Sequence, residues 1–315
     1  MKIAAVIATY NRKKLLRECL QALLSQTRQL DEIIVVDGNS TDGTNLMMES
    51  EFPHVTYIRL NKNIGASGHF HEGMKLAYKK GYDWIWVMDD DAEPKENTLE
   101  ELLKWSNLNS VAALVPVVRD EDMNVQIEHR GNLCFDTIFP LIQKPLTQKE
   151  YCSNVPLIIT FTSFVGPLIS RKAISKIGFP RKEFFIYHDD VEYSIRLTRV
   201  GKIYLIPNAY IIHKIKRRKS KRSRGKKGFT IPYEDMWIRY YAFRNIIYLG
   251  KLYSTNKLKF IMDASKLLSR LIIRTILFED YKLRLLLFFL SAYVDGFRGV
   301  FDNAKPKRIL YGNKY

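Results

Sequence analysis

The first part of the chain alternates short apolar runs with longer amphipathic stretches. Residues 2–8 (KIAAVIA), 32–37 (EIIVVD), 55–60 (VTYIRL) and 84–89 (WIWVMD) are apolar runs of strand length. Residues 13–26 place leucines and Cys19 at the i, i+3, i+4 spacing of a helix. Strands that alternate with helices predict an α/β fold, in which a mainly parallel sheet is covered by helices on both faces.

The pattern continues less regularly up to residue 213. It predicts a helix at 99–105, a strand at 112–118, strand material at 156–170, a short helix at 171–178, a helix from Asp189 and a last strand at 202–213. Residues 61–73 (NKNIGASGHFHEG) are typical of a glycine-punctuated loop. Residues 119–155 show no pattern that assigns them to a helix or a strand.

Unusual polar residues follow the ends of the predicted strands. In a parallel sheet, ligands bind beyond the carboxyl ends of the strands, so we expect these residues to converge at one edge. Any one of them is equally compatible with ordinary turn chemistry. The set consists of Thr9, Asn11 and Arg12, then Asp37, then Asn63 and Gly65, and finally Asp89, Asp90 and Asp91.

The three consecutive carboxylates Asp89 to Asp91 are difficult to explain by folding alone, because like charges repel and resist burial. Asp89 and Asp91 can both reach one divalent cation if the strand ends in a turn there. Mg²⁺ and Mn²⁺ prefer oxygen ligands, commonly one or two carboxylates together with substrate phosphates. The triplet therefore predicts a reaction in which a nucleoside diphosphate leaves a metal-bound site, with no general acid from the protein.

An attacking hydroxyl in such a reaction needs a base. Asp189 and Asp190 are the candidates, because they begin a predicted helix, where the helix dipole favours anions. One of the two can instead be only a helix cap. His213, at the end of the last strand, is a candidate third metal ligand, although a lone histidine more often has a structural role.

Charge divides the chain into two parts. Residues 1–213 carry 25 Lys and Arg against 26 Asp and Glu, whereas the last 102 residues carry an excess of +18. Residues 214–227 contain ten basic residues and no acid, and we predict a mobile basic loop over 214–228. Residues 229–315 are predicted to be helical, with a basic amphipathic stretch that suits either an anionic membrane surface or packing against the rest of the protein.

The three cysteines, Cys19, Cys134 and Cys152, are odd in number and form no CxxC pair, which favours a reducing, cytoplasmic setting. The N-terminal apolar run is too short for a signal peptide, so no export is implied. The longest uncharged run, residues 285–294, is about half the ~20 residues that a membrane-spanning helix requires.

Seven motifs in order give the chain a family resemblance: VIATYNR, IIVVDGNSTDGT, NIGASGHFHEG, WVMDDDAEP, FVGPLIS, FFIYHDDVEYSIR and the terminal His213. Over residues 1–213 the chain resembles the inverting glycosyltransferases of family 2, most of all their bacterial galactofuranosyl- and rhamnosyltransferase branch, with weaker similarity in residues 240–249. The resemblance implies a GT-A catalytic domain at 1–213 with a C-terminal helical extension. It also implies transfer from a UDP-galactofuranose or dTDP-rhamnose type donor to a lipid-linked or polysaccharide acceptor, in cell-envelope glycan synthesis at the inner face of the cell membrane.

Family roles transfer by motif. Asp190 matches the catalytic base, and Asp89 and Asp91 match the outer members of the DXD motif, with His213 as a further ligand of Mn²⁺ or Mg²⁺. The residues matched to nucleotide contacts are Thr9, Asn11, Arg12, Asp37, Asn63, Gly65 and Asp90. The chain departs from the galactofuranosyl pattern Gly-Gly-Ser-Gly-Gly-Phe in residues 65–70, which read Gly-Ala-Ser-Gly-His-Phe. This added bulk leaves the donor sugar open.

Two other classes of function were weighed. A nucleic-acid-binding protein would explain the basic tail but would leave the acidic strand end unused, so we expect no nucleic-acid partner. A sugar nucleotidyltransferase would also use metal-binding carboxylates, but it would need a glycine-rich basic loop near the N-terminus, which TYNRKK does not resemble. Finally, residues 214–227 either fold over the donor diphosphate or serve as a solvated linker or lipid-attracted arm.

Overall fold

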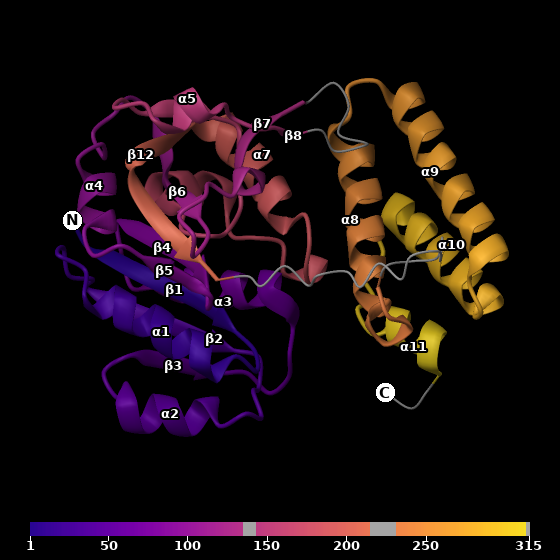
Figure 1. Cartoon of the computed structure of the whole chain (residues 1–315), viewed down its shortest axis with the longest axis horizontal. Coiled ribbons are helices and arrows are strands. Elements are labelled where there is room, and N and C mark those ends of the chain that lie inside the picture. Colours follow the sequence, from indigo (N-terminus) through magenta and orange to yellow (C-terminus); the bar gives the residue numbers. More distant parts are fainter. Residues whose placement is uncertain (135–142, 215–230, 313–315) are drawn as a thin grey trace. The chain divides into compact units, whose positions relative to one another are not determined.

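The computed structural model describes residues 1–134, 143–214 and 231–312. These residues form two compact units, whose helices and strands are labelled in Figure 1. The sheet unit comprises residues 1–132, 143–182 and 189–214, and the helical unit comprises 133–134, 183–188 and 231–312. The predicted basic loop, except for Lys214, lies outside the described residues.

The sheet unit is built on a large mixed sheet with strand order β3-β2-β1-β4-β11-β6-β12-β5, and β9 pairs with β12. The longer strands β1, β2, β3, β4, β6 and β12 all run in one direction, whereas the three-residue strands β5, β9 and β11 are antiparallel to their neighbours. This confirms the predicted α/β sheet. The strands are β1 (Ile3–Thr9), β2 (Glu32–Asp37), β3 (Thr56–Arg59), β4 (Trp84–Asp89), β5 (Ala92–Pro94), β6 (Val111–Arg119), β9 (Leu157–Ile159), β11 (Leu168–Ser170) and β12 (Lys202–His213).

Helices cover both faces of this sheet, because its central strands are apolar on both sides. Ile3, Ala5 and Ile7 of β1 pack in one core with helix α1, whereas Ala4 and Val6 pack in the other core with helices α3 and α7. The helices of the sheet unit are α1 (Lys13–Leu24), α2 (Thr44–Glu51), α3 (Gly65–Lys79), α4 (Thr98–Leu103), α5 (Gln148–Tyr151), α6 (Arg171–Ile177) and α7 (Asp189–Val200).

The prediction of a loop through residue 73 is wrong, because helix α3 already begins at Gly65. The glycines in this stretch serve close packing as well as the turn. Gly65 has a φ of +80°, which suits glycine at the start of the helix. A Cβ at Gly68 would lie 2.7 Å from Ile64 Cγ1, and one at Gly73 would clash with Val6 of β1.

The stretch 119–155, which carried no sequence pattern, folds into short elements. They are a 3-10 turn η1 (Ile127–His129), β7 (Arg130–Leu133), β8 (Gln143–Lys144) and helix α5. Strand β7 pairs with β8 and with β10 (Phe161–Thr162) in a small three-stranded sheet. The predicted strand material of 156–170 is thus divided among β9, β10 and β11.

The helical unit contains α8 (Trp237–Tyr253), α9 (Lys257–Phe278), α10 (Lys282–Arg298) and α11 (Lys305–Tyr311), preceded by the 3-10 turn η3 (Tyr233–Asp235), as predicted for a helical extension. Tyr240, Leu285, Phe288 and Leu310 belong to its own apolar core. Among the described helices, none combines the length and the apolar character that a membrane span requires.

Candidate active site

The sheet brings the predicted strand-end residues together at one edge. Strand β1 lies between β2 and β4, and in this register Thr9 pairs with Asp37 and Ala8 pairs with Asp89. All three strands are parallel, so their carboxyl ends meet at the same edge. The expected convergence of the residues after β1, β2 and β4 is therefore present in the fold.

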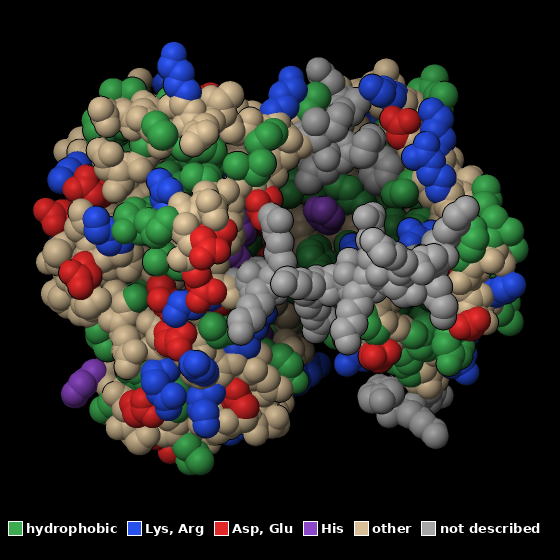
Figure 2. Space-filling model, viewed as in Figure 1, with side chains coloured by type: hydrophobic (Ala, Val, Ile, Leu, Met, Phe, Trp, Pro, Cys, Tyr) green, Lys and Arg blue, Asp and Glu red, His purple; other side chains and the backbone are tan. Residues whose placement is uncertain are grey.

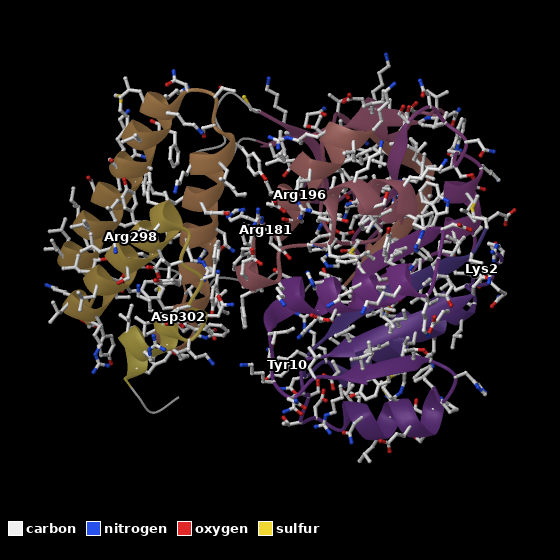
Figure 3. All side chains as sticks on the ribbon, turned by 180° about the vertical axis from the view of Figure 1, so that it is seen from behind. Lys2, Tyr10, Arg181, Arg196, Arg298 and Asp302 are labelled. Atoms are coloured by element: carbon white, nitrogen blue, oxygen red, sulfur yellow. The ribbon has the colours of Figure 1, made fainter. Side chains whose placement is uncertain are left out.

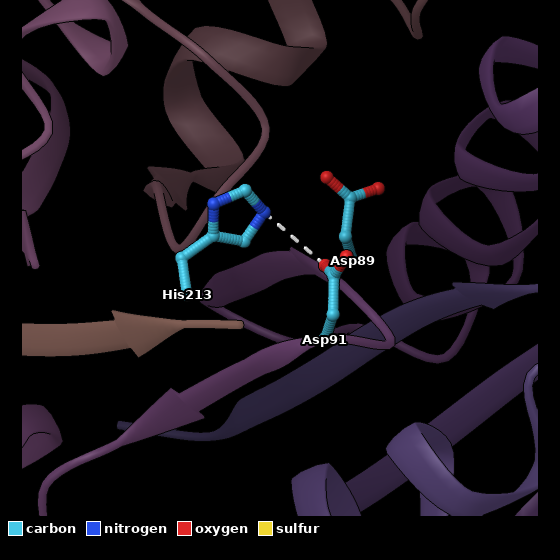
Figure 4. A group of neighbouring side chains, drawn as sticks. All are labelled: Asp89, Asp91 and His213. Atoms are coloured by element: carbon cyan, nitrogen blue, oxygen red, sulfur yellow. Dashed lines mark ion pairs between the residues drawn. The ribbon is translucent and has the colours of Figure 1, made fainter. Parts of the chain in front are cut away.

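Asp89, Asp91 and His213 form a cluster at this edge (Figure 4). One potential ligand atom from each residue lies within 4.8 Å of the others, and His213 Nε2 is 3.2 Å from Asp91 Oδ1. The pairing of β12 with β5 creates this proximity, because it sets His213 opposite Ala92, the residue after Asp91. Lys214 extends the pairing by donating its backbone N–H to the Asp91 carbonyl over 2.9 Å.

The donor set of this cluster fits a hard divalent cation. Two carboxylates and one imidazole suit Mn²⁺ and Mg²⁺. Apart from their mutual approach, Asp91 Oδ1 and His213 Nε2 are buried without a hydrogen-bond partner among the described residues. Buried polar atoms without partners are costly, so this pair is poised to bind a ligand.

His213 is oriented by a residue that the sequence analysis did not single out. Its Nδ1 lies 3.0 Å from Gln126 Oε1, so Nδ1–H donates to the amide oxygen and Nε2 is the ring nitrogen that faces Asp91. The Gln126 amide nitrogen in turn donates to the His213 carbonyl over 3.1 Å. His129 shares Gln126 Oε1 through its own Nε2 at 3.0 Å. Burial lowers the pKa of His129 to about 3, which keeps this neighbour neutral.

The carboxylates of the triplet differ in their pKa. Burial, reinforced by the charge of Asp91, raises the pKa of Asp89 to about 7. Burial also raises the pKa of Asp90 to about 6, although Arg12 opposes this shift. For Asp91, burial is outweighed by His213 and Arg12, and its pKa is lowered. The pKa values of the three carboxyl groups are therefore shifted in different directions, downward for Asp91 and upward for Asp89 and Asp90.

Arg12 and Thr9 bind the triplet directly. The Arg12 guanidinium donates from Nη1 to Asp90 Oδ1 (3.1 Å) and to Asp91 Oδ2 (2.7 Å). The Thr9 hydroxyl donates to Asp90 Oδ2 over 2.8 Å in a buried hydrogen bond. These contacts explain how three adjacent carboxylates are tolerated at a strand end: Asp90 is turned into the protein, and Arg12 offsets part of the charge.

The other predicted nucleotide residues shape the neighbouring loops. Asp37 is buried and accepts hydrogen bonds from the Ser40 hydroxyl and the Tyr57 hydroxyl, each over 2.5 Å. Asn11, with a φ of +53°, accepts from the backbone N–H of Thr41 over 2.7 Å. Asn63 Oδ1 accepts from the backbone N–H of Gly65 over 2.8 Å, which fixes the entry into helix α3.

Asp189 and Asp190 occupy the first turn of helix α7, as predicted. The Ser67 hydroxyl, in the first turn of α3, donates to Asp189 Oδ2 over 2.7 Å. Burial, and then the charge of Asp189, raises the pKa of Asp190 to about 7. Because α3 begins just after the carboxyl end of β3, the Ser67 bond ties the start of α7 to the edge that carries the acidic triplet.

Comparisons with solved structures place the fold among GT-A glycosyltransferases. The structure is similar to that of GalNAc-T7 with UDP, GalNAc and Mn²⁺, with a TM-score of 0.62 over 97% of this chain and 57% of that chain at 14% identity. It is also similar to Staphylococcus aureus TarS 1–349, with a TM-score of 0.54 over 98% of this chain and 82% of that one at 14% identity. The predicted GT-A fold is confirmed.

Sequence comparison then gives the family. The profile of Glycosyl transferase family 2 matches residues 4–178, and the chain belongs to this family. It is therefore a glycosyltransferase, which confirms the predicted enzyme class and sets aside the nucleotidyltransferase alternative.

Two curated relatives indicate the branch. The chain is 31% identical to galactofuranosyltransferase GlfT1 of Mycolicibacterium smegmatis over 205 residues, which are 63% of this chain and 66% of that protein. It is 22% identical to the N-acetylglucosaminyl-diphospho-decaprenol L-rhamnosyltransferase of Mycobacterium tuberculosis over 236 residues, which are 67% of this chain and 75% of that protein. The chain thus spans just under two thirds of the length of GlfT1.

Proposed function

We propose that this glycosyltransferase is metal-dependent and inverting, and that it moves a sugar from a nucleoside diphosphate donor to a hydroxyl of a lipid-linked or polysaccharide acceptor. The observation that carries the proposal is the cluster of Asp89, Asp91 and His213 at the carboxyl edge of the sheet, with the start of α7 tied to that edge. The proposed base and the proposed metal site would thus share the edge where α/β sheets bind their ligands.

Asp190 is the proposed base. Its pKa of about 7 lets it accept a proton at neutral pH. Its Oδ1 accepts from the Val191 N–H over 2.7 Å, and Asp189 accepts from the buried Ser67 hydroxyl. In the proposed reaction the acceptor oxygen forms the new bond to the anomeric carbon while Asp190 takes its proton. The bond from that carbon to the diphosphate oxygen breaks, and its electron pair leaves with the nucleoside diphosphate. Attack from the face opposite the leaving group inverts the configuration.

Asp89, Asp91 and His213 would hold Mn²⁺ or Mg²⁺. A cation bound there would neutralise the charge that develops on the departing diphosphate. Arg12 would support this site by keeping the charged oxygens of Asp91 in place. Thr9, Asn11, Arg12, Asp37, Asn63, Gly65 and Asp90 remain the proposed nucleotide-binding set, either by direct contact or by shaping the loops at this edge.

The donor is proposed to be of the UDP-galactofuranose or dTDP-rhamnose type, which the names of the two relatives support. We propose that His69 influences which donor sugar is accepted. Its ring lies against Gly38, where an added Cβ would come within 2.7 Å of it, and its buried Nε2 has no hydrogen-bond partner in the described part of the chain. The histidine therefore occupies space at the end of β2 that a glycine would leave open.

We also propose that the enzyme works at an anionic membrane surface, on the cytoplasmic side. On helix α9 the exposed apolar residues Leu258, Ile261, Met262, Ile273 and Ile276 fall on one face. The basic residues Lys259, Lys266 and Arg270 fall along its border. We call these eight residues the α9 face, and Figure 2 shows both green and blue side chains on the part of the surface where Figure 1 places this helix. Apolar burial combined with basic side chains is what binds amphipathic helices to anionic lipid, at about 1 kcal/mol for each Lys or Arg near the surface.

The catalytic proposal is tested by measuring nucleoside diphosphate release from a panel of nucleotide sugars with Mn²⁺ and a polyprenyl-linked acceptor. We expect Asp91→Asn and Asp190→Asn each to lower kcat at least about 100-fold. Asp122→Asn, at an exposed carboxylate of the sheet unit, is the matched control and should keep full activity. Undiminished turnover in either site variant would refute the mechanism.

The membrane proposal is tested separately by co-sedimentation with vesicles. Phosphatidylglycerol vesicles should retain the wild-type protein more than phosphatidylcholine vesicles, and Ile273→Ser should weaken retention. Leu46→Ser removes a side chain of similar exposure from the sheet unit and should not change it. Equal retention on both kinds of vesicle would contradict the proposed surface.

A further inference from the structure

The segment that leads into the proposed base has an unusual backbone. Phe185, Tyr187 and His188 have φ values of +67°, +68° and +63°, in the left-handed region that side-chain-bearing residues rarely adopt. The Ile186 N–H donates to the Phe184 carbonyl over 2.8 Å, which with the positive φ of Phe185 matches the strained form of a γ-turn. Three such residues among four persist only if the surroundings hold them.

The side chain of Asn245 on helix α8 supplies several of the hydrogen bonds that stabilise this segment. Its Nδ2 donates to the carbonyls of Phe184, Ile186 and Tyr187 at 3.0, 3.1 and 2.8 Å. One amide nitrogen thus lies within hydrogen-bond distance of three carbonyl oxygens of the strained turn. The Asn245 side chain is completely buried, so its amide has no access to solvent as an alternative partner.

Arg244 holds Asn245 and adds further bonds to the segment. Its Nε donates to Asn245 Oδ1 over 3.0 Å, which orients the amide with its nitrogen toward the carbonyls. Its Nη2 donates to the carbonyls of Glu183 and Phe184 at 3.2 and 3.0 Å. Arg244 is also completely buried, and its Nη1 donates to Asn303 Oδ1 over 2.8 Å.

Aromatic packing also stabilises this segment. Phe185 stacks on Tyr241 with ring centroids 4.7 Å apart and an angle of 22° between the planes. Phe184 stacks on Phe301 at 5.7 Å. All these contacts lie within the helical unit, which includes residues 183–188. The next residue along the chain is Asp189, where helix α7 and the proposed catalytic pair begin.

We infer that Asn245 and Arg244 are positioning residues for catalysis: they hold residues 184–188 in a strained conformation that sets where the chain enters α7, and hence where Asp190 points. The inference rests on the proposed role of Asp190 as base. The two residues would act only through the backbone of residues 184–188, which directly precede Asp189 in the chain. Neither residue is proposed to touch the substrate.

The test uses the full-length protein with Asn245→Ala and the isosteric Asn245→Asp. Alanine removes the amide nitrogen that donates to the three carbonyls, and aspartate turns a carboxylate toward these carbonyl oxygens. We expect kcat to fall about 10- to 100-fold for alanine and further for aspartate, because a base displaced by ~1 Å can lose about 100-fold in rate. The donor KM should stay within about 2-fold, and the Mn²⁺-induced rise in melting temperature should be unchanged, because the metal cluster is left intact.

The matched control is Thr275→Val, a buried change in the same unit whose hydroxyl has no hydrogen-bond partner among the described residues. It should alter neither kcat nor KM. If Asn245→Ala does not give folded protein, Phe185→Leu serves instead, because Phe185 is only half-buried and its substitution weakens the stack on Tyr241. It should lower kcat with the same unchanged KM.

Amide hydrogen exchange separates this inference from the proposed function. In Asn245→Ala the peptide covering residues 184–191 should exchange at least about 10-fold faster than in the wild type and in Thr275→Val. If the wild type turns over no donor, the proposed function fails, and exchange alone decides whether Asn245 holds the segment. If the enzyme is active, three results for Asn245→Ala would overturn the inference. They are an unchanged kcat, a donor KM that rises by as large a factor as kcat falls, and unchanged hydrogen exchange.

Discussion

The hydroxyl of Ser67 donates to the carboxylate of Asp189 over 2.7 Å, although 122 residues separate the two in sequence. This buried hydrogen bond joins the first turn of α3 to the first turn of α7. It occupies one member of the acidic pair and leaves the other, Asp190, with a pKa of about 7. Burial raises the pKa of Asp189 as well, and Asp190 Oδ1 accepts from the Val191 N–H, so the proposed choice of Asp190 as base is a matter for experiment.

The Ser67 bond can be tested by Ser67→Ala. The change leaves a buried carboxylate oxygen without its donor, which should cost about 1–3 kcal/mol of unfolding free energy. Activity should fall as well, because Asp189 is then free to compete with Asp190 for a proton. Urea denaturation and the transferase assay measure the two effects. Ser175→Ala, at an exposed serine of α6, should change neither, and an unaltered midpoint for Ser67→Ala would count against the bond.

The pH dependence of the reaction follows from the raised pKa of Asp190. A base must be deprotonated to accept a proton, and a pKa of about 7 means that most Asp190 is protonated below this pH. We therefore expect kcat/KM to rise with pH up to about 7 and to level off above it. Measuring initial rates from pH 5 to 9 tests this, and a rate already constant from pH 5 would show that Asp190 is not the titrating base.

Metal binding should be visible without any substrate. A cation that binds only the folded protein stabilises it by about 2.7 kcal/mol at a hundredfold excess over its dissociation constant. Mn²⁺ should therefore raise the melting temperature of the wild type, and Asp91→Asn should abolish this shift. Asp122→Asn should retain it. Equal shifts in the wild type and Asp91→Asn would mean that the ion binds elsewhere.

Gln126 should tune the affinity for the cation through His213. Gln126→Ala removes the acceptor that fixes the tautomer of the imidazole, and such outer-shell changes typically cost about 10- to 100-fold in metal affinity. Titration with Mn²⁺, followed by calorimetry, measures the constant. The exposed Gln148→Ala is the control, and an unchanged affinity for Gln126→Ala would argue that His213 does not bind the ion.

Glu192, in the third position after Asp189, should act mainly on stability. Its buried carboxylate accepts from Arg181 Nε over 3.1 Å and from Arg196 Nη2 over 2.7 Å, and both arginines are labelled in Figure 3. Removing one partner of a buried ion pair costs about 3–5 kcal/mol. Glu192→Ala should lower the unfolding free energy by about 3 kcal/mol in urea, whereas the exposed Glu121→Ala should not. A loss below about 1 kcal/mol would show that the arginines find other partners.

Much of the fold could be predicted from the sequence. Apolar runs such as residues 2–8 and 32–37 became β1 and β2, because an apolar run of strand length is stable only where both its faces are buried. The mistake at residues 65–73 has an equally clear cause. Gly68 and Gly73 suggest a turn when the sequence is considered alone. In the structure they are required because a side chain there would clash with Ile64 and Val6, and such contacts cannot be seen in the sequence.

By itself, the sequence determined the longer apolar strands of the sheet unit, the edge at which polar residues gather, and the acidic pairs Asp89–Asp91 and Asp189–Asp190, because these depend on periodicity and on residues close together in the chain. Only the tertiary structure decided which distant groups meet. The pairing of β12 with β5 brought His213 to Asp91, the turn that folds back on the end of β6 brought in Gln126, and α8 reached the segment before Asp189. Such encounters arise from long-range pairing and packing, for which a local pattern carries no signal.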